Sequence, residues 1–429
     1  MPFDLSARRS GIVLHLTSLP GPHGLGDLGD EAHRFVDWLA ASGQSLWQVL
    51  PIHPVGPGNS PYQCPSAFAG SPWLVALAPL ATAPAFDAAQ ADYERAIPWR
   101  WAMLRQAAAG FEVRGKPAER QRFEAWCAAA ADWLDGWCLY AALKDAHHGQ
   151  PWWAWGEPLA RRDAAALRAA RATHAEAMRV HAFVQWVFDE QLQALRGYAH
   201  SRGVFLMGDV PIFVAHDSAD VWLRPELYFM DERHELTVVA GVPPDGFGPD
   251  GQRWGNPLYR WERMAEDGYA WWVARLKRAL AQADLVRVDH FRGFAGYWEV
   301  PAHCPTAREG RWAPGPGAAL FEACRAALGP SWPKTWAPSR STSSSCVTAS
   351  ACPACASCRR PSAAGAMVRR PPTRCTPSCR TTTCRTPWPT AARTTATPRA
   401  AGGTTPAPRC APSRPSTWPA TTPRASTGR

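Results

Sequence analysis

Four short apolar runs, each followed by polar residues, constrain the possible folds of this chain more than any other feature. They occupy residues 11–16, 46–51, 204–209 and 285–289. Because the segments between them carry helical patterns, these runs predict the buried strands of a parallel sheet in an α/β protein. The polar side chains at their carboxyl ends are His15, His53, Asp209 and Asp289. Functional groups at that end of parallel strands are typical of a TIM (β/α)8 barrel, which is the fold we predict.

The long segment between the second and third runs, roughly residues 80–200, has a different pattern. Ala, Trp, Arg and Glu recur there at helical spacing, as in the stretch from Phe123 through Trp133 to Leu139. Such spacing indicates amphipathic helices. We therefore predict a helical subdomain inserted into the barrel, in which most of the Trp side chains serve packing.

Composition divides the chain near residue 330. Residues 331–429 contain 15 basic residues and no Asp, Glu, Leu, Ile, Phe or Tyr, yet they hold 16 of the 42 Pro and 8 of the 13 Cys. Such a segment cannot bury enough apolar surface to offset its ordering entropy, so we expect it to be disordered. The remaining 31 basic and 36 acidic residues give residues 1–330 a net charge of −5. The overall charge of +10 therefore belongs to the tail.

The tail carries two patterns that resemble binding sites. Its cysteines have spacings seen in metal sites, but no His, strand or helix pattern accompanies them, so we expect no zinc or iron–sulfur cluster. These cysteines are Cys352, Cys355, Cys358, Cys375, Cys379 and Cys384. The Arg residues would bind nucleic acid only through charge, so we expect no specific nucleic-acid partner.

The start of the chain and its hydropathy predict a cytoplasmic protein. The first residues, MPFDLSARRSGIVLHL, contain no long apolar stretch with a cleavage site. No run reaches the length of a transmembrane helix, so we expect no membrane partner. The few cysteines of residues 1–330 are scattered, as in reduced proteins.

Arg287 and Asp289 are the first candidates for chemistry. They lie two residues apart on a predicted strand, so their side chains leave the same face. A guanidinium beside a carboxylate keeps that carboxylate ionised, as a carboxylate nucleophile requires. Taken alone, the pair is better interpreted as a structural ion pair at the end of a strand.

Four longer motifs accompany this pair in a fixed order. Residues 11–20 read GIVLHLTSLP, 59–73 read NSPYQCPSAFAGSPW, 208–222 read GDVPIFVAHDSADVW and 241–260 read GVPPDGFGPDGQRWGNPLYR. Together they resemble the amylomaltases, the 4-α-glucanotransferases or disproportionating enzymes of glycoside hydrolase family 77. The resemblance covers residues 8–302 and is weakest in the helical insertion.

The resemblance implies a TIM-barrel enzyme that needs no cofactor or metal. It would transfer α-1,4-glucan segments to glucose or maltooligosaccharide acceptors by a retaining double displacement. On matching positions, Asp289 would be the nucleophile and Arg287 the residue that orients it. The implied substrate-binding residues are Tyr62, Asp209, Asp245, Gln252, Trp254 and His290.

The residue types suit these roles. Tyr and Trp offer a flat apolar face with a polar edge to a sugar ring. The stretch 241–257, rich in Gly and Pro, suits a mobile lid that excludes water. The alternative for Asp209, His290 and the groove residues is ordinary packing.

The second carboxyl of a retaining mechanism is missing from the sequence. Such a mechanism needs an acid/base roughly 5 Å from the nucleophile. The family carries it as Glu in an Ala-Glu-Asp-Leu-Gly run, and a Gly-Thr-His-Asp run follows later. Neither run is present, and the acids after Asp289 are Glu299, Glu309 and Glu322. Glu299 lies in a Tyr-Trp-Glu-Val-Pro run that matches the family, but away from its acid/base position.

The genetic code accounts for both missing runs. If the third base of each codon is joined to the first two of the next, Trp332 followed by Pro333 can only give Ala, and Trp336 followed by Ala337 can only give Gly. The codons between permit Glu-Asp-Leu, and the same shift over residues 391–397 permits Gly-Thr-His-Asp-Ser-Asp. We infer a frameshift close to residues 329–332. The second half of the barrel would then be replaced by the tail.

These observations predict a 4-α-glucanotransferase of maltodextrin, starch or glycogen metabolism that is inactive as written. It would lack its acid/base, and a half barrel leaves an open sheet edge. Two alternatives are an α-glucan hydrolase of the same clan and a non-catalytic glucan-binding remnant. A third is a nucleic-acid binder, whose salt-sensitive binding would vanish on truncation at Pro330. The oligomeric state is left open.

Overall fold

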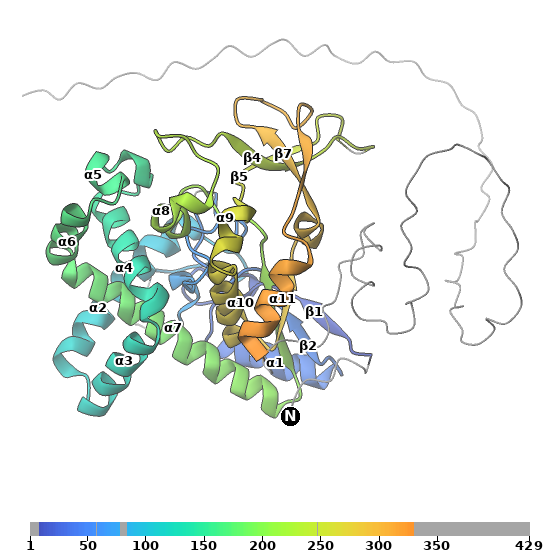
Figure 1. Cartoon of the computed structure of the whole chain (residues 1–429). Helices are drawn as coiled ribbons and strands as arrows, with labels where there is room; N and C mark the ends of the chain where they lie inside the picture. The colour runs from blue at the N-terminus through green and yellow to red at the C-terminus, as the bar shows by residue number, and fades with distance from the viewer. Residues whose placement is uncertain (1–7, 57, 78–83, 247, 330–429) are drawn as a thin grey trace, which may run out of the picture. The chain divides into compact units, whose positions relative to one another are not determined.

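The computed structural model describes residues 8–329 except residues 57, 78–83 and 247. The predicted disordered tail, its cysteines and the codons of the inferred frameshift beyond residue 329 lie outside the described residues. The described part is a mixed α/β structure with two separate sheets of four strands (Figure 1).

All four predicted strands form, and they pair into one parallel sheet. They are β1 (Gly11–Val13), β2 (Leu46–Gln48), β3 (Phe205–Val210) and β6 (Leu285–Val288). Their spatial order is β1-β2-β3-β6, which is also their order along the chain. The sheet therefore grows in one direction, with helical segments in each connection. The α/β prediction is confirmed at this level.

The register of the sheet gives it two distinct faces. Val13, Gln48, Met207 and Leu285 are successive partners across the four strands, and Asp209 pairs with Arg287. Since side chains alternate along each strand, these residues share one face, called here the site face. The positions between them point the other way and form the helix-covered face. The latter comprises Ile12, Trp47, Leu206, Gly208, Val210, Val286 and Val288.

Helices connect the strands and cover one side of the parallel sheet. Leu192 and Leu195 of α7 join Leu206 and the fully buried Trp47 in one apolar cluster. The segment predicted as a helical insertion contains α2 to α7. The helices are α1 (Asp30–Ala41), α2 (Tyr93–Arg114), α3 (Pro117–Ala129), α4 (Ala131–Ala146), α5 (Glu157–Ala160), α6 (Ala164–Thr173), α7 (Ala175–Ser201), α8 (Ala219–Leu223), α9 (Trp261–Glu266), α10 (Ala270–Gln282) and α11 (Ala318–Leu328). Single 3-10 turns are η1 (Leu16–Ser18), η2 (Pro72–Leu74), η3 (Trp152–Ala154), η4 (Pro225–Leu227) and η5 (Phe291–Phe294).

The second sheet is antiparallel, and the sequence patterns did not predict it. It has the order β5-β4-β7-β8, with strands β4 (Val238–Val242), β5 (Gln252–Pro257), β7 (Gly296–Pro301) and β8 (Arg311–Pro314). The stretch 241–257, expected as a lid, therefore consists largely of the hairpin β4–β5. Gly241 permits this pairing, because a Cβ at that position would lie 2.5 Å from the carbonyl oxygen of Gln252.

Several Trp side chains serve packing; of those named here, Trp152 belongs to the predicted insertion. Trp152, Trp222 and Trp272 are fully buried in a cluster that also contains Tyr228 and Tyr259. Among the described residues, no helix combines the length and apolar composition that crossing a bilayer requires.

Candidate active site

Arg287 joins two carboxylates at the carboxyl end of the parallel sheet. Its Nη1 donates to both oxygens of Asp209, at 2.7 and 2.8 Å, and its Nη2 donates to Oδ1 of Asp289. The geometry follows from the strand register, because Asp209 and Arg287 are direct partners and Asp289 follows two residues later. The predicted pairing of Arg287 with Asp289 is present, and Asp209 completes it.

The three groups have unequal access to solvent. The Asp209 side chain is fully buried, whereas those of Arg287 and Asp289 are partly exposed. Burial raises the pKa of Asp209, although the Tyr62 hydroxyl and the Arg287 guanidinium oppose this shift. Burial also acts to lower the pKa of Arg287, but the carboxylates of Asp209 and Asp289 outweigh it, so that pKa rises. The accessible carboxylate of the cluster is Asp289.

Tyr62 connects this cluster to a cavity. Its hydroxyl donates to Oδ2 of Asp209 at 2.8 Å, and burial together with that hydrogen bond raises the pKa of the phenol. A cavity of about 290 Å³ adjoins it. The cavity is lined by Ser60, Tyr62, Gln63, Pro211, Ile212, Phe213, Trp254, Asn256, Asp289 and His290. Asp289 and Tyr62 thus face the same space.

Aromatic rings form part of the cavity wall. Trp254 and His290 meet edge to face with ring centroids 4.9 Å apart. His290 has a left-handed backbone (φ 50°), which turns the chain directly after Asp289. Burial lowers the pKa of His290 and outweighs the opposing effect of Asp289, which favours the neutral imidazole. A neutral imidazole offers one donor and one acceptor to a polyhydroxyl ligand.

Three of the six predicted binding residues do not line the cavity. Asp209 is buried behind Tyr62 and Arg287, as described above. Gln252 is exposed and accepts a hydrogen bond from Nε1 of Trp254 at 3.0 Å. Asp245 is exposed in the loop between β4 and β5, where its Oδ1 accepts from the Gly248 amide at 2.8 Å. Both belong to the hairpin that carries Trp254.

The cavity also contains residues that the sequence interpretation did not single out. Gln63 donates to Oδ1 of Asn256 at 3.3 Å, and Asn256 in turn donates to the Val214 carbonyl at 2.9 Å. Phe213 packs between Trp254 and Tyr259. All three lie within the quoted motifs, beside residues that were selected, so adjacency in those motifs was the available signal.

The three acids that follow Asp289 lie elsewhere. Glu299 on β7 pairs with Arg311 of β8, with 2.9 Å between the carboxylate and Nε. Glu309 and Glu322 are exposed, the latter on α11. Among the residues that the structure describes, the cavity lining contains one carboxylate, that of Asp289.

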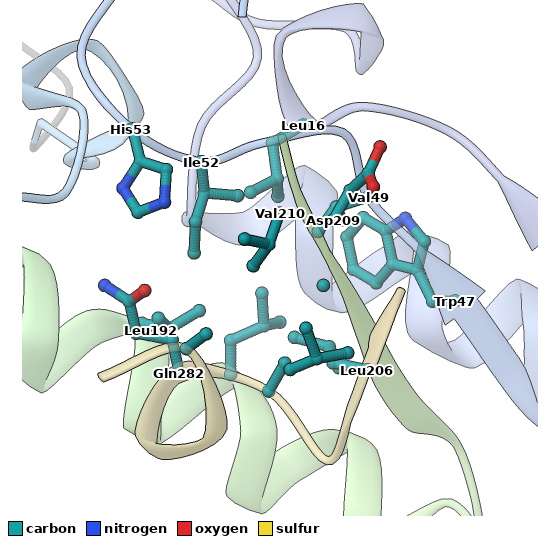
Figure 2. Close-up of a pocket in the computed structure, with 15 residues that line it drawn as sticks. Leu16, Trp47, Val49, Ile52, His53, Leu192, Leu206, Asp209, Val210 and Gln282 are labelled. Carbon is teal, nitrogen blue, oxygen red and sulfur yellow. The ribbon is translucent and has the colours of Figure 1, made fainter. Parts of the chain in front are cut away.

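A second, much smaller void lies on the opposite side of the sheet. It measures about 20 Å³ and separates the helix-covered face from α7 and α10. Figure 2 shows Trp47, Leu206, Leu192 and Gln282 around it, with the carboxylate of Asp209 directed away. His53 also borders it, and burial lowers the pKa of this imidazole to about 4. The apolar lining and small size make this void a packing defect.

Fold and site together define an α/β protein with a cavity suited to a polyhydroxyl ligand, in which a guanidinium-held carboxylate faces aromatic walls. The family model described as 4-alpha-glucanotransferase matches residues 14–335. The chain belongs to that family, glycoside hydrolase family 77.

Individual relatives agree with this assignment. The 4-alpha-glucanotransferase of Thermus thermophilus is 49% identical over 329 residues, which are 75% of this chain and 66% of the relative. That of Synechocystis sp. is 45% identical over 341 residues, or 77% and 68% of the two chains. The solved amylomaltase from Streptococcus agalactiae in complex with acarbose is 33% identical, with a TM-score of 0.70 over 75% of this chain and 67% of that one. The chain thus spans about two thirds of the length of these relatives.

Proposed function

We propose that this chain is the amino-terminal two thirds of a cytoplasmic 4-α-glucanotransferase that acts on α-1,4-glucans. In this proposal the parallel sheet is the first half of a (β/α)8 barrel. The observation that carries it is the placement of Asp289, which is held by Arg287 and faces a cavity with aromatic walls.

Asp289 is the nucleophile of the proposed reaction. Its carboxylate attacks the anomeric carbon of a bound glucan and forms a covalent glycosyl-enzyme, while the leaving glucan oxygen takes a proton from the acid/base. An acceptor hydroxyl then displaces Asp289 as the same group removes its proton. Arg287 supports this role, because its ion pair keeps the carboxylate charged and oriented.

The other cavity residues bind the sugar. Tyr62 and Trp254 provide apolar faces, and neutral His290 with the Gln63–Asn256 pair provides hydrogen-bonding groups. Asp209 accepts hydrogen bonds from Arg287 and Tyr62, so we assign it the role of positioning these two side chains. Asp245 and Gln252 lie on the β4–β5 hairpin outside the cavity lining, and in this proposal they bind the parts of longer glucans that extend beyond the cavity.

The chain as written is inactive in this proposal, because the acid/base is encoded in a shifted reading frame. Two observations support a change of frame near residue 330. The family match ends at residue 335, and the segment that follows contains no Asp or Glu. No described acid other than Asp289 lines the cavity.

The decisive experiment compares three purified proteins with maltotriose as substrate. The first is the full chain, the second is a chain whose frame is restored by one base at codon 330, and the third is the restored chain with Asp289→Asn. We expect glucose and longer oligosaccharides only from the second, with a loss of at least about 10³-fold for Asp289→Asn because the nucleophile is gone. Transfer by the full chain above the Asp289→Asn background would refute the proposed inactivity.

Two alternative functions give different results in the same experiment. If the restored chain releases glucose and maltose without longer products, it is a hydrolase. If the full chain binds maltooligosaccharide tightly without turnover, it is a glucan-binding remnant. The cavity of about 290 Å³ beside Trp254 is the observation that favours such binding.

A further inference from the structure

Arg275 is a buried guanidinium behind the wall of the cavity. It projects from α10, and the whole residue is 1% exposed. Its Nη2 donates to the Pro211 carbonyl at 2.5 Å, and its Nη1 donates to the Ile212 carbonyl at 3.1 Å. Pro211 and Ile212 both belong to the cavity lining. The planar fork of the guanidinium therefore binds two consecutive carbonyls of the wall from the core side.

These two carbonyls and two indole rings compensate the charge of Arg275. Its Cζ lies 4.8 Å from the ring centroid of Trp272 and 5.3 Å from that of Trp271. Burial raises the pKa of Asp220 to about 6, although the charge of Arg275 opposes the rise. The Nε of Arg275 has no hydrogen-bond partner among the described residues. Because burying a guanidinium is costly unless it is paired, the bonds from its two Nη atoms are the contacts that stabilise it in this position.

Tyr259 adds a second donor to one of these carbonyls. Its hydroxyl donates to the Ile212 carbonyl at 2.8 Å and accepts from Nη1 of Arg275 at 3.4 Å. The Tyr259 side chain is fully buried. The Ile212 carbonyl thus accepts two hydrogen bonds, which use both of its lone pairs. This peptide group therefore has little freedom to rotate.

Ile212 contacts the turn that follows Asp289. A Cβ added to Gly293 in that turn would lie 2.6 Å from Cδ1 of Ile212 and 3.1 Å from Cδ2 of His290. The Ile212 side chain and the His290 ring therefore both pack directly against the Gly293 backbone. In addition, the Asp289 amide donates to the Val210 carbonyl at 2.9 Å. The end of β3 and the residue after it thus contact both the nucleophile and its neighbouring turn.

We propose that Arg275 is a positioning residue of the site: by fixing the Ile212 peptide, it fixes the turn that carries His290. Without these hydrogen bonds the Ile212 peptide would be free to rotate, and the turn would lose its support. The His290 ring would then gain access to solvent and lose its edge-to-face contact with Trp254. The proposal rests on the proposed function in one respect, namely that the ligand of the cavity is a glucan.

Arg278 provides a matched control on the same helix. Its side chain is 12% exposed, its Cζ lies 4.7 Å from the ring centroid of Trp133, and its Nε donates to the Phe68 carbonyl at 3.0 Å. It also forms two hydrogen bonds with the Asp189 carboxylate, at 2.7 and 2.8 Å. None of these partners lines the cavity. Arg278→Met should therefore destabilise the chain at least as much as Arg275→Met, without changing the cavity wall.

The first measurement is an NMR titration of the His290 imidazole in the full chain, with the signal assigned by its loss in His290→Gln. Burial lowers the pKa of His290 from its ordinary 6.5, Asp289 opposes this shift and Arg292 adds to it. Arg275→Met should raise that pKa toward 6.5, because the ring gains solvent. Arg278→Met should leave it unchanged.

A milder pair of variants covers the case in which Arg275→Met does not fold. Tyr259→Phe removes one of the two donors to the Ile212 carbonyl and keeps the ring, so it should raise the pKa of His290 in the same direction but less. Tyr228→Phe removes a buried hydroxyl that has no hydrogen-bond partner among the described residues. Its ring centroid lies 5.4 Å from that of Tyr259. This control should leave the His290 titration unchanged.

The second measurement is calorimetric binding of maltotriose to the full chain and to the frame-restored chain. Arg275→Met should weaken binding by about fivefold, the equivalent of one lost hydrogen bond to the ligand. Arg275→Lys should weaken it less, because an ammonium keeps the charge but cannot bind both carbonyls with a planar fork. Arg278→Met should bind maltotriose like the wild-type chain.

The outcomes separate the positioning proposal from the proposed function. An unchanged His290 titration in both Arg275→Met and Tyr259→Phe overturns the positioning proposal, and so do equal shifts in Arg275→Met and Arg278→Met. A shift confined to the Arg275 and Tyr259 variants supports it. If neither the full chain nor the frame-restored chain binds maltotriose, the proposed function is overturned, while such a confined shift still supports the role of Arg275 in positioning the wall.

Discussion

Leu46 and Trp47 are neighbours on β2, yet they lie in opposite environments. Trp47 is fully buried on the helix-covered face, where its Nε1 donates to the Leu14 carbonyl at 2.8 Å. Leu46 is half-buried on the site face, in register with Phe205. Both faces carry apolar side chains, but Trp47 and Leu206 on the helix-covered face are buried, whereas Leu46 and Met207 on the site face are half-buried. The difference shows that the described helices bury Trp47 and Leu206 on one face, whereas parallel sheets are commonly covered on both faces.

The largest effect that should separate the two faces is the loss of a core side chain. Trp47→Ala should lower the free energy of unfolding by about 3–5 kcal/mol, because it leaves a large cavity beneath Phe35 and frees the Leu14 carbonyl. Leu46→Ala should cost less, about 1–2 kcal/mol, since its side chain is only partly buried. Urea unfolding followed by circular dichroism measures both. Equal losses would mean that the site face is already covered.

A second effect is that the two faces should respond to acid in opposite directions. Burial lowers the pKa of His53 from 6.5 to about 4, so the unfolded chain binds the proton more readily. Its contribution to stability is therefore lost as the pH falls from 6.5 toward 4, by at most about 1.4 kcal/mol per pH unit. Burial raises the pKa of Asp209, so its contribution is present at low pH and is lost as the pH rises through the folded value.

Unfolding free energies measured between pH 4 and 7 test these signs. His53→Gln should reduce the loss of stability on acidification, because Gln keeps a donor for the Ala69 carbonyl but does not titrate. Asp209→Asn should steepen the loss, since it removes the opposing titration. Superimposable profiles for the wild-type chain and His53→Gln would contradict the assignment.

The smallest effect concerns the hydrogen bond beneath the cavity. Tyr62→Phe removes the donor at 2.8 Å from Asp209 and should cost about 1 kcal/mol of stability. It should also raise the pKa of Asp209 further, because the hydroxyl stabilises the charged carboxylate. Urea unfolding measures the first effect, and a carboxyl NMR titration of the same protein measures the second. An unchanged Asp209 titration would show that Arg287 alone controls this carboxylate.

The parallel sheet could be predicted from the sequence because its strands are short, continuous apolar runs, a pattern that is typical of buried strands. The sequence did not predict the antiparallel sheet, whose strands contain Gly and Pro and pair with partners far along the chain. Val239, for example, pairs with Val300 of β7, which lies 61 residues further along the chain. Nonlocal pairing of this kind overrides propensity, since packing and cross-strand contacts decide it.

The site shows the same division between local and nonlocal information. Spacing along one strand was sufficient to predict that Arg287 meets Asp289. The bond from Arg287 to Asp209 depends on the register of two strands 78 residues apart, and the link from Gln63 to Asn256 spans 193 residues. No pattern within a single segment encodes such a contact.

The pairing of Asp209 with Arg287 has a consequence for how the chain folds. A slip of one residue between β3 and β6 would turn one of the two side chains onto the helix-covered face, as an unpaired charge among Leu192, Leu195 and Trp47. That cost makes the misaligned sheet unstable, whereas a slip between purely apolar strands would be nearly neutral. The ion pair between Asp209 and Arg287 thus also disfavours a misaligned pairing of β3 and β6, the two strands that carry these residues.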